Sequence, residues 1–300
     1  MTAERPRQSQ ELLVESPRPV CQLRRLALVV LGVLTGLSAG RPAHAQEPVL
    51  VASVEGISEY RLDNGLRVLL LPDASGPRIT VVMTYLVGVR HEGYGETGMA
   101  HLLEHMLLKG TDEHPDIGME MRRRGASFDA STWFDRTNYY ETLLATDDNL
   151  SWALGLEADR MLNARIRDDE LRSERMVVVS ELAYYESLLL SSLQKRVRAT
   201  AYQRHNYGKS VGGEPSDLDN VPIERLRVFY RRYYQPDNAV LLIAGRFDER
   251  RALKLASEKF GTIPRPVRTG EMRLWPTYTR EPPQEGEREI TLRRVGGVIR

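Results

Sequence analysis

The sequence has one cysteine and almost no net charge. Cys21 is the only thiol in the 300 residues, and the formal net charge is +1. Since Cys21 lies in a segment that we expect to be removed, the mature chain has no disulfide and no thiolate nucleophile. Nucleic-acid-binding proteins usually carry a basic bias, so the charge balance argues against a nucleic acid as partner.

The N-terminal apolar run is short for a membrane span. Arg24 and Arg25 precede Leu26–Leu37, whereas a comfortable span needs about 20 residues. Ala43-His44-Ala45 follows as a small-x-small cleavage signal, so residues 1–45 are predicted to be a signal peptide. We therefore expect a periplasmic or secreted protein with no stable span after cleavage; an uncleaved anchor is the alternative. The arginine pair leaves open whether export follows the twin-arginine route.

Strand-like and helix-like segments alternate after this leader, which predicts an α+β fold. Residues 265–287, rich in Pro, Glu and Arg, read as a linker after a domain at 46–264. Strands are expected at Tyr60–Leu71 with a turn at Asn64-Gly65, at Ile79–Val89, twice within 122–144 around Asp135, within 233–247, and beginning at 288–300. Helices are expected at 97–111 with Thr97 as N-cap, at 147–166, at 169–198 and at 248–264.

The stretch "HLLEHMLLKGT" holds two histidines four residues apart with a glutamate between them. On a helix, His101 and His105 share one face, and two imidazoles at this spacing can bind one Zn²⁺. Glu104 can reach a water at the metal without being a ligand, in the inverse of the better-known His-Glu-x-x-His order. A helix with scattered polar residues is the alternative, but the combination favours a metal site.

A catalytic zinc needs a third protein ligand, which must come from elsewhere in the chain. The segment "SERMVVVSELAYYES" offers Glu174 and Glu181, whose spacing of nearly two helical turns places both on one face. One carboxylate could ligate while the other supports the site. The residues alone do not say which, and both could equally be solvated glutamates.

The chain resembles the pitrilysin/insulinase family of zinc peptidases, the inverzincins. The resemblance rests on "TGMAHLLEHMLLKGT", "GASFDASTWFDRTNYYETL", "LEADRM", "SERMVVVSE" and the long segment from His205 to Asp248, and extends from about Ile57 to Pro264. It implies one half of the kind found in mitochondrial processing peptidase: a mixed, mainly antiparallel sheet covered by helices on one side.

The resemblance also implies roles for individual residues. His101, His105 and Glu181 match the ligands of one Zn²⁺ per chain, Glu104 the general base that takes a proton from the attacking water, and Glu174 an auxiliary acidic residue. The segment "ASFDAST" matches the edge strand that pairs with extended substrate, where Asp129 stands in place of the Asn of many relatives. The implied substrate-binding residues are Ala126, Ser127, Phe128, Asp129 and Ala130.

These features predict a zinc-dependent endopeptidase that hydrolyses peptides or small unfolded proteins. Relatives usually carry a second homologous domain, and residues 288–300 resemble its first strand. The resemblance therefore implies a second copy or another homologous chain as partner. The alternatives are a non-catalytic, peptide-binding partner subunit, and an inactive truncated fragment of a two-domain peptidase.

Overall fold

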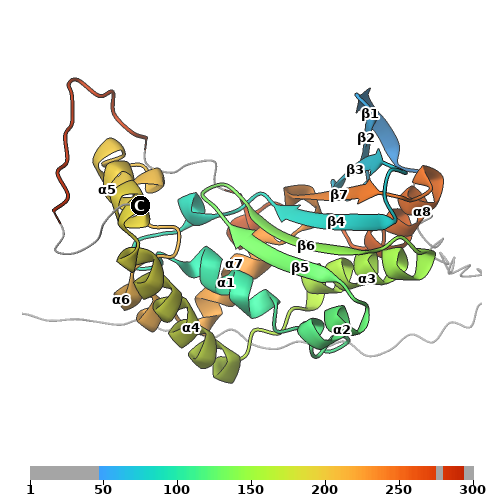
Figure 1. Ribbon diagram of the computed structural model, residues 1–300, viewed down its shortest axis with the longest axis horizontal. Coiled ribbons are helices and arrows are strands. Elements are labelled where there is room, and N and C mark those ends of the chain that lie inside the picture. The colour runs from blue at the N-terminus through green and yellow to red at the C-terminus, as the bar shows by residue number, and fades with distance from the viewer. Residues whose placement is uncertain (1–46, 275–279, 294–300) are drawn as a thin grey trace, which may run out of the picture. The chain divides into compact units, whose positions relative to one another are not determined.

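The computed structural model describes residues 47–274 and 280–293 (Figure 1). The predicted signal peptide lies outside the described residues. The strands are β1 (Val49–Val54), β2 (Ile57–Arg61), β3 (Arg67–Pro72), β4 (Arg78–Tyr85), β5 (Ser127–Thr132), β6 (Thr137–Leu144) and β7 (Ala239–Gly245). The helices are α1 (Met99–Leu107), α2 (Ile117–Arg123), α3 (Asp147–Asn163), α4 (Asp168–Ser187), α5 (Leu189–Ala201), α6 (Pro215–Asn220), α7 (Ile223–Tyr233) and α8 (Glu249–Phe260).

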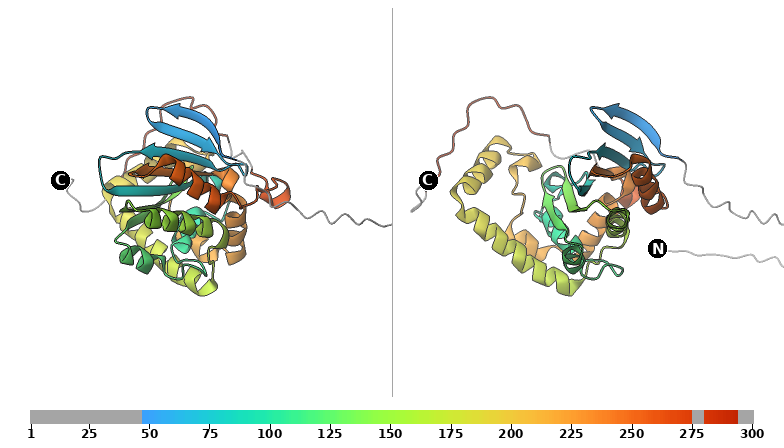
Figure 2. Two further views of the ribbon diagram at one scale, coloured as in Figure 1. Left: turned by 90° about the vertical axis from the view of Figure 1, so that its right-hand side faces the viewer. Right: turned by 45° about the vertical axis from the view of Figure 1, so that its right-hand side comes forward.

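The strands form one seven-stranded sheet in the order β1-β2-β3-β7-β4-β6-β5. Only the β3–β7 pair is parallel among the pairs described, and the others are antiparallel. Side chains alternate between buried and half-buried along β4, β6 and β7, as expected when only one face of a sheet is covered. Helices α1, α3, α7 and α8 lie against that face (Figures 1 and 2). The predicted α+β class is confirmed.

Helix α1 carries the histidine pair and is anchored by its apolar side. Leu102, Leu103 and Met106 are fully buried in the core, whereas His101 and His105 are only partly buried on the opposite side. The amphipathic pattern of the segment therefore directs both imidazoles away from the core and towards the neighbouring helix α4.

The N-terminus of α1 differs from the prediction. Gly98, with φ of +87°, is the N-cap instead of Thr97, whose hydroxyl donates to Asp217. The buried carboxylate of Glu92 accepts hydrogen bonds from the backbone N–H groups of Gly98 and Ala100, at 2.9 and 2.8 Å. A side chain six residues upstream thus satisfies helix-end donors that a local cap usually satisfies.

The single long helix expected at 169–198 is two helices. Leu188 has extended backbone (φ −77°, ψ 124°), and α4 and α5 meet there at a bend of 94° (Figure 2). No single described helix is long and apolar enough to cross a membrane; α4 and α5 meet that criterion only as a bent pair. Residues 288–293 form no strand, and the rest of the strand expected there lies outside the described residues.

Candidate metal centre

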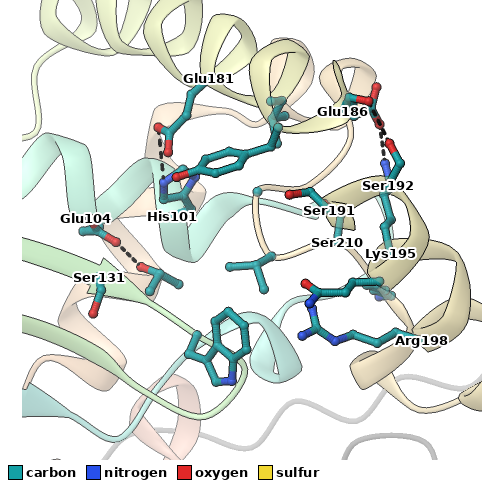
Figure 3. Close-up of a pocket in the computed structure, with 18 of the residues that line it drawn as sticks. His101, Glu104, Ser131, Glu181, Glu186, Ser191, Ser192, Lys195, Arg198 and Ser210 are labelled. Carbon is teal, nitrogen blue, oxygen red and sulfur yellow. Dashed lines mark hydrogen bonds and ion pairs between the residues drawn. The ribbon is translucent and has the colours of Figure 1, made fainter. Parts of the chain in front are cut away.

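Two histidines of α1 and one glutamate of α4 face each other. The Nε2 atoms of His101 and His105 lie 3.7 and 3.4 Å from Oε2 of Glu181. One potential ligand atom from each of the three side chains lies within 4.8 Å of the other two. Figure 3 shows Glu181 reaching from α4 towards His101. Two imidazole nitrogens and one carboxylate form the donor set of a catalytic zinc site with a position left for water.

The carboxylate of Glu174 contacts the imidazole of His105 on the side opposite to Glu181. Oε2 of Glu174 lies 3.1 Å from Nδ1 of His105, and the other carboxylate oxygen pairs with the ammonium of Lys109. With its proton on Nδ1, His105 donates to Glu174 and turns the lone pair of Nε2 towards Glu181. Two acceptors facing each other at this distance repel unless a cation lies between them. The donor set therefore fits a divalent metal, with Glu174 orienting a ligand.

His101 is also in the form that binds metals. Burial, together with the neighbouring His105, lowers the pKa of His101 to about 4. Its imidazole is therefore neutral at pH 7, and neutral imidazole is the ligand form. Its Nδ1 atom is buried without a hydrogen-bond partner among the described residues.

Glu104 lies beside this group and is held by the sheet. Burial raises the pKa of Glu104 to about 7, although a hydrogen bond from Thr132 lowers it. The Thr132 hydroxyl donates to Oε2 of Glu104 at 2.5 Å, which connects α1 to the last residue of β5. A carboxyl group with a pKa near neutrality can both accept and release a proton at pH 7.

A cavity of about 390 Å³ opens at this group (Figure 3). Its lining includes His101, Glu104 and Glu181, the end of β5, the α4–α5 junction and residues 209–212. Strand β5 is at the edge of the sheet, since β6 is its only neighbour in the strand order. Of the predicted substrate-binding residues, Ser127 to Ala130 lie on this edge strand and Ala126 directly precedes it; Ala130 also lines the cavity.

Sequence reasoning missed several side chains around the site. Thr132 and Lys109 contact it and Arg198 lines its cavity; the first two lie within the quoted segments, but no motif assigned any of the three a role. Apart from this site, one donor atom each of Glu113, His114 and Asp159 lies within 4.8 Å of the others. Glu113 and His114 lie shortly after the inverted motif, but Asp159 comes from α3, and no spacing rule predicts the group.

Comparison with known proteins identifies the family of the chain. The family model described as "Insulinase (Peptidase family M16)" matches residues 67–214, and the model "Peptidase M16 inactive domain" matches residues 220–297. The zinc protease PqqE of Helicobacter pylori is 30% identical over 78% of this chain and 53% of its own length. Subunit 1 of the bovine cytochrome b-c1 complex is also 30% identical, over 70% of this chain and 44% of its own length.

Solved structures share the fold. A protease from Helicobacter pylori superposes with a TM-score of 0.69 at 30% identity, covering 75% of this chain and 54% of that one. The periplasmic protease PqqL of Escherichia coli gives 0.68 at 25% identity, covering 76% of this chain and 26% of that one. The chain spans about half the length of the first curated relatives that it matches. The predicted family is confirmed, and the chain belongs to the insulinase family of peptidases, M16.

Proposed function

We propose that this protein is a zinc-dependent endopeptidase acting on peptides or small unfolded proteins. The observation that carries the proposal is the convergence of His101, His105 and Glu181 beside the buried Glu104. We assign the first three as ligands of one Zn²⁺ per chain. Family membership supports a peptidase in general, and the site supports this reaction in particular.

The chain's own residues supply positioning and proton transfer. A zinc ion in this site would polarise the scissile carbonyl and lower the pKa of water. Glu104 accepts the proton of the attacking water and later delivers it to the leaving amine. Thr132 fixes the orientation of that carboxylate, and Glu174 fixes the imidazole of His105.

An extended peptide would bind as an added strand on the free edge of β5. Main-chain hydrogen bonds to Ala126–Ala130 would give affinity with little demand on sequence, as in other cases of β-augmentation. The end of β5 lines the same cavity as His101 and Glu104, so a peptide paired there would bring a carbonyl towards the candidate metal site.

A non-catalytic partner subunit is the second candidate. The bovine relative is named as subunit 1 of the cytochrome b-c1 complex and not as a protease, so family membership alone does not imply catalysis. The presence of all three candidate ligands and of Glu104 favours the enzyme. Under either function we propose that a second homologous chain is the partner. We also propose export to the periplasm, since the relative PqqL is a periplasmic protease.

Metal content and cleavage of quenched fluorescent peptides, measured on one purified sample, test the proposal. We expect about one zinc per chain and turnover that a chelator abolishes and zinc restores. Glu104→Gln should bind as much zinc but lose turnover, because the amide cannot accept the proton. A protein without zinc would contradict the ligand assignment. Zinc binding with no cleavage, even when a homologous chain is added, would favour the non-catalytic subunit.

A further inference from the structure

The cavity at the candidate metal site has a basic end. In Figure 3, His101, Glu104 and Glu181 lie on one side, while Lys195 and Arg198 project from α5 on the other. Lys209 also lines the cavity. The three residues of the metal site are therefore separated from Lys195 and Arg198, and Glu186 lies beside Lys195 at the basic end.

Arg198 is restrained by aromatic rings, and the part of the chain that the structure describes offers no carboxylate that pairs with its charge. Its guanidinium lies over the rings of Trp133 and Phe134, at 5.0 and 5.2 Å from their centroids. Within the described ranges no carboxylate lies at ion-pair distance from it. Cation–π contact with these rings restrains the guanidinium and does not use its N–H donors. Arg198 thus presents preorganised donors that suit a planar carboxylate.

The two lysines of the lining differ in their ion pairs. Lys195 lies 2.7 Å from Glu186 and 3.0 Å from Glu214, so its charge is compensated. Lys209 lies 5.1 Å from the ring centroid of Tyr94, and the described residues place no carboxylate within 4 Å of its ammonium. The nearby Glu92 is buried and engaged by backbone N–H groups of α1.

The charge balance of the lining leaves an anion to be supplied. The lining has as many acidic as basic side chains, namely Glu104, Glu181 and Glu186 against Lys195, Arg198 and Lys209. A divalent cation beside Glu181, where we place one, would therefore leave a positive excess. Arg198 and Lys209 are the cations of the lining for which the described residues provide no carboxylate within 4 Å.

We propose that Arg198, with Lys209, forms a subsite for a carboxylate of the substrate, so that the enzyme prefers peptides carrying Asp or Glu, or a free C-terminus, close to the cleaved bond. The inference rests on the proposed function. The residues Ala130 to Thr132 of β5 line the same cavity, and alternate side chains of a peptide added to that edge point to one face. One such side chain would enter the cavity next to the bond presented to the metal site.

Matched peptides test the preference on the zinc-loaded protein. Amidated peptides would carry Glu, Gln or Lys at each position around the cleaved bond, with mass spectrometry locating the cut. We expect kcat/KM for Glu to exceed that for Gln by about tenfold at one position, as for a charge-assisted hydrogen bond. Arg198→Glu should reverse the preference towards Lys, and Arg198→Lys should retain it in part. Arg196→Glu makes the same charge change at an exposed position of α5 outside the cavity lining, and should leave it unchanged.

A binding measurement separates this proposal from the proposed function. Fluorescence anisotropy with the same peptides on zinc-loaded Glu104→Gln, with and without Arg198→Glu, needs no turnover. Acid-selective binding that depends on Arg198 supports the subsite even if no peptide is cleaved, in which case the peptidase fails alone. Cleavage or binding without acid preference overturns the carboxylate subsite and leaves the proposed peptidase function standing. Equal effects of the Arg198 and Arg196 substitutions have the same consequence. If no peptide binds, the carboxylate subsite is also wrong. Free-acid peptides without Asp or Glu show whether a terminal carboxylate can occupy it.

Discussion

Glu174 gives the sharpest test of how the site is built, since it contacts a proposed ligand and is not one itself. Its carboxylate is 3.1 Å from Nδ1 of His105 and 6% exposed. Outer carboxylates of this kind typically contribute 10–100-fold to metal affinity. Glu174→Gln keeps an oxygen that can accept from Nδ1 but loses the charge, so we expect about a tenfold weaker zinc affinity, near 1.4 kcal/mol. Glu174→Ala loses charge and contact together, and we expect about 100-fold.

Lys109 allows a second test of the loss of zinc affinity expected when Glu174 is substituted. Its ammonium pairs with Glu174, so removing the carboxylate leaves an uncompensated cation near the proposed ligand His105. Lys109→Met in the Glu174→Gln background should therefore recover part of the lost affinity, because one source of repulsion is removed. A double substitution that is no better than the single one would limit the effect of Glu174 to its contact with His105.

Competition with a chromophoric chelator measures zinc affinity directly and does not depend on turnover. Asp169→Asn is the matched control, because it removes one negative charge from an exposed position on the same helix. If Glu174→Gln binds zinc as tightly as the wild type, or if Asp169→Asn weakens binding equally, the assignment of Glu174 as an orienting residue is wrong.

Two further expectations concern stability and use urea unfolding of the metal-free protein. Burial raises the pKa of Glu92 to about 8 from an ordinary value near 4.5, so the native state holds a proton that the unfolded chain releases. The free energy of unfolding should therefore fall by about 2–4 kcal/mol between pH 4.5 and 8, and Glu92→Gln, which cannot titrate, should flatten that decline; an unchanged decline would refute this. Gly213 has φ of +84°, and a Cβ there would lie 2.2 Å from the carbonyl oxygen of Thr97, so Gly213→Ala should cost more than about 2 kcal/mol. Gly76→Ala, which meets no atom within 4 Å, should stay within about 0.5 kcal/mol, and equal costs would contradict the reasoning.

Local signals explain which elements could be predicted. Helix α1 was visible because its apolar residues and its two histidines follow the same 3.6-residue period. Its N-cap was misplaced because the side chain of Glu92, and not that of Thr97, accepts from the N–H groups at this helix end, and no rule based on adjacent residues can find such a partner. The sheet order was equally out of reach, since the β3–β7 pairing joins Arg67 to Val240 across most of the chain.

The break between α4 and α5 had no sequence signal and has the largest effect on the cavity. Neither Gly nor Pro lies near Leu188, yet its extended backbone bends the chain by 94°. The bend sends α5 across the end of β5 and brings Arg198 over Trp133. A straight helix, as predicted, would carry Arg198 away from the candidate metal site, so the proposed carboxylate subsite depends on a feature that only the structure shows.

Helical periodicity alone could not assign the roles of Glu174 and Glu181. Two residues seven positions apart on a helix are separated by about 10 Å along its axis, so Glu174 and Glu181 lie on one face of α4 but at different positions along it. Helix α1 lies against α4 such that His105 contacts both: Glu174 at Nδ1 and Glu181 at Nε2. His101 faces Glu181 alone, and only Glu181 can therefore join both imidazoles around one ion. The spacing in the sequence does not distinguish the two glutamates as possible ligands. The packing of α1 on α4 does, because it makes Glu181 the proposed ligand and Glu174 the residue that orients His105.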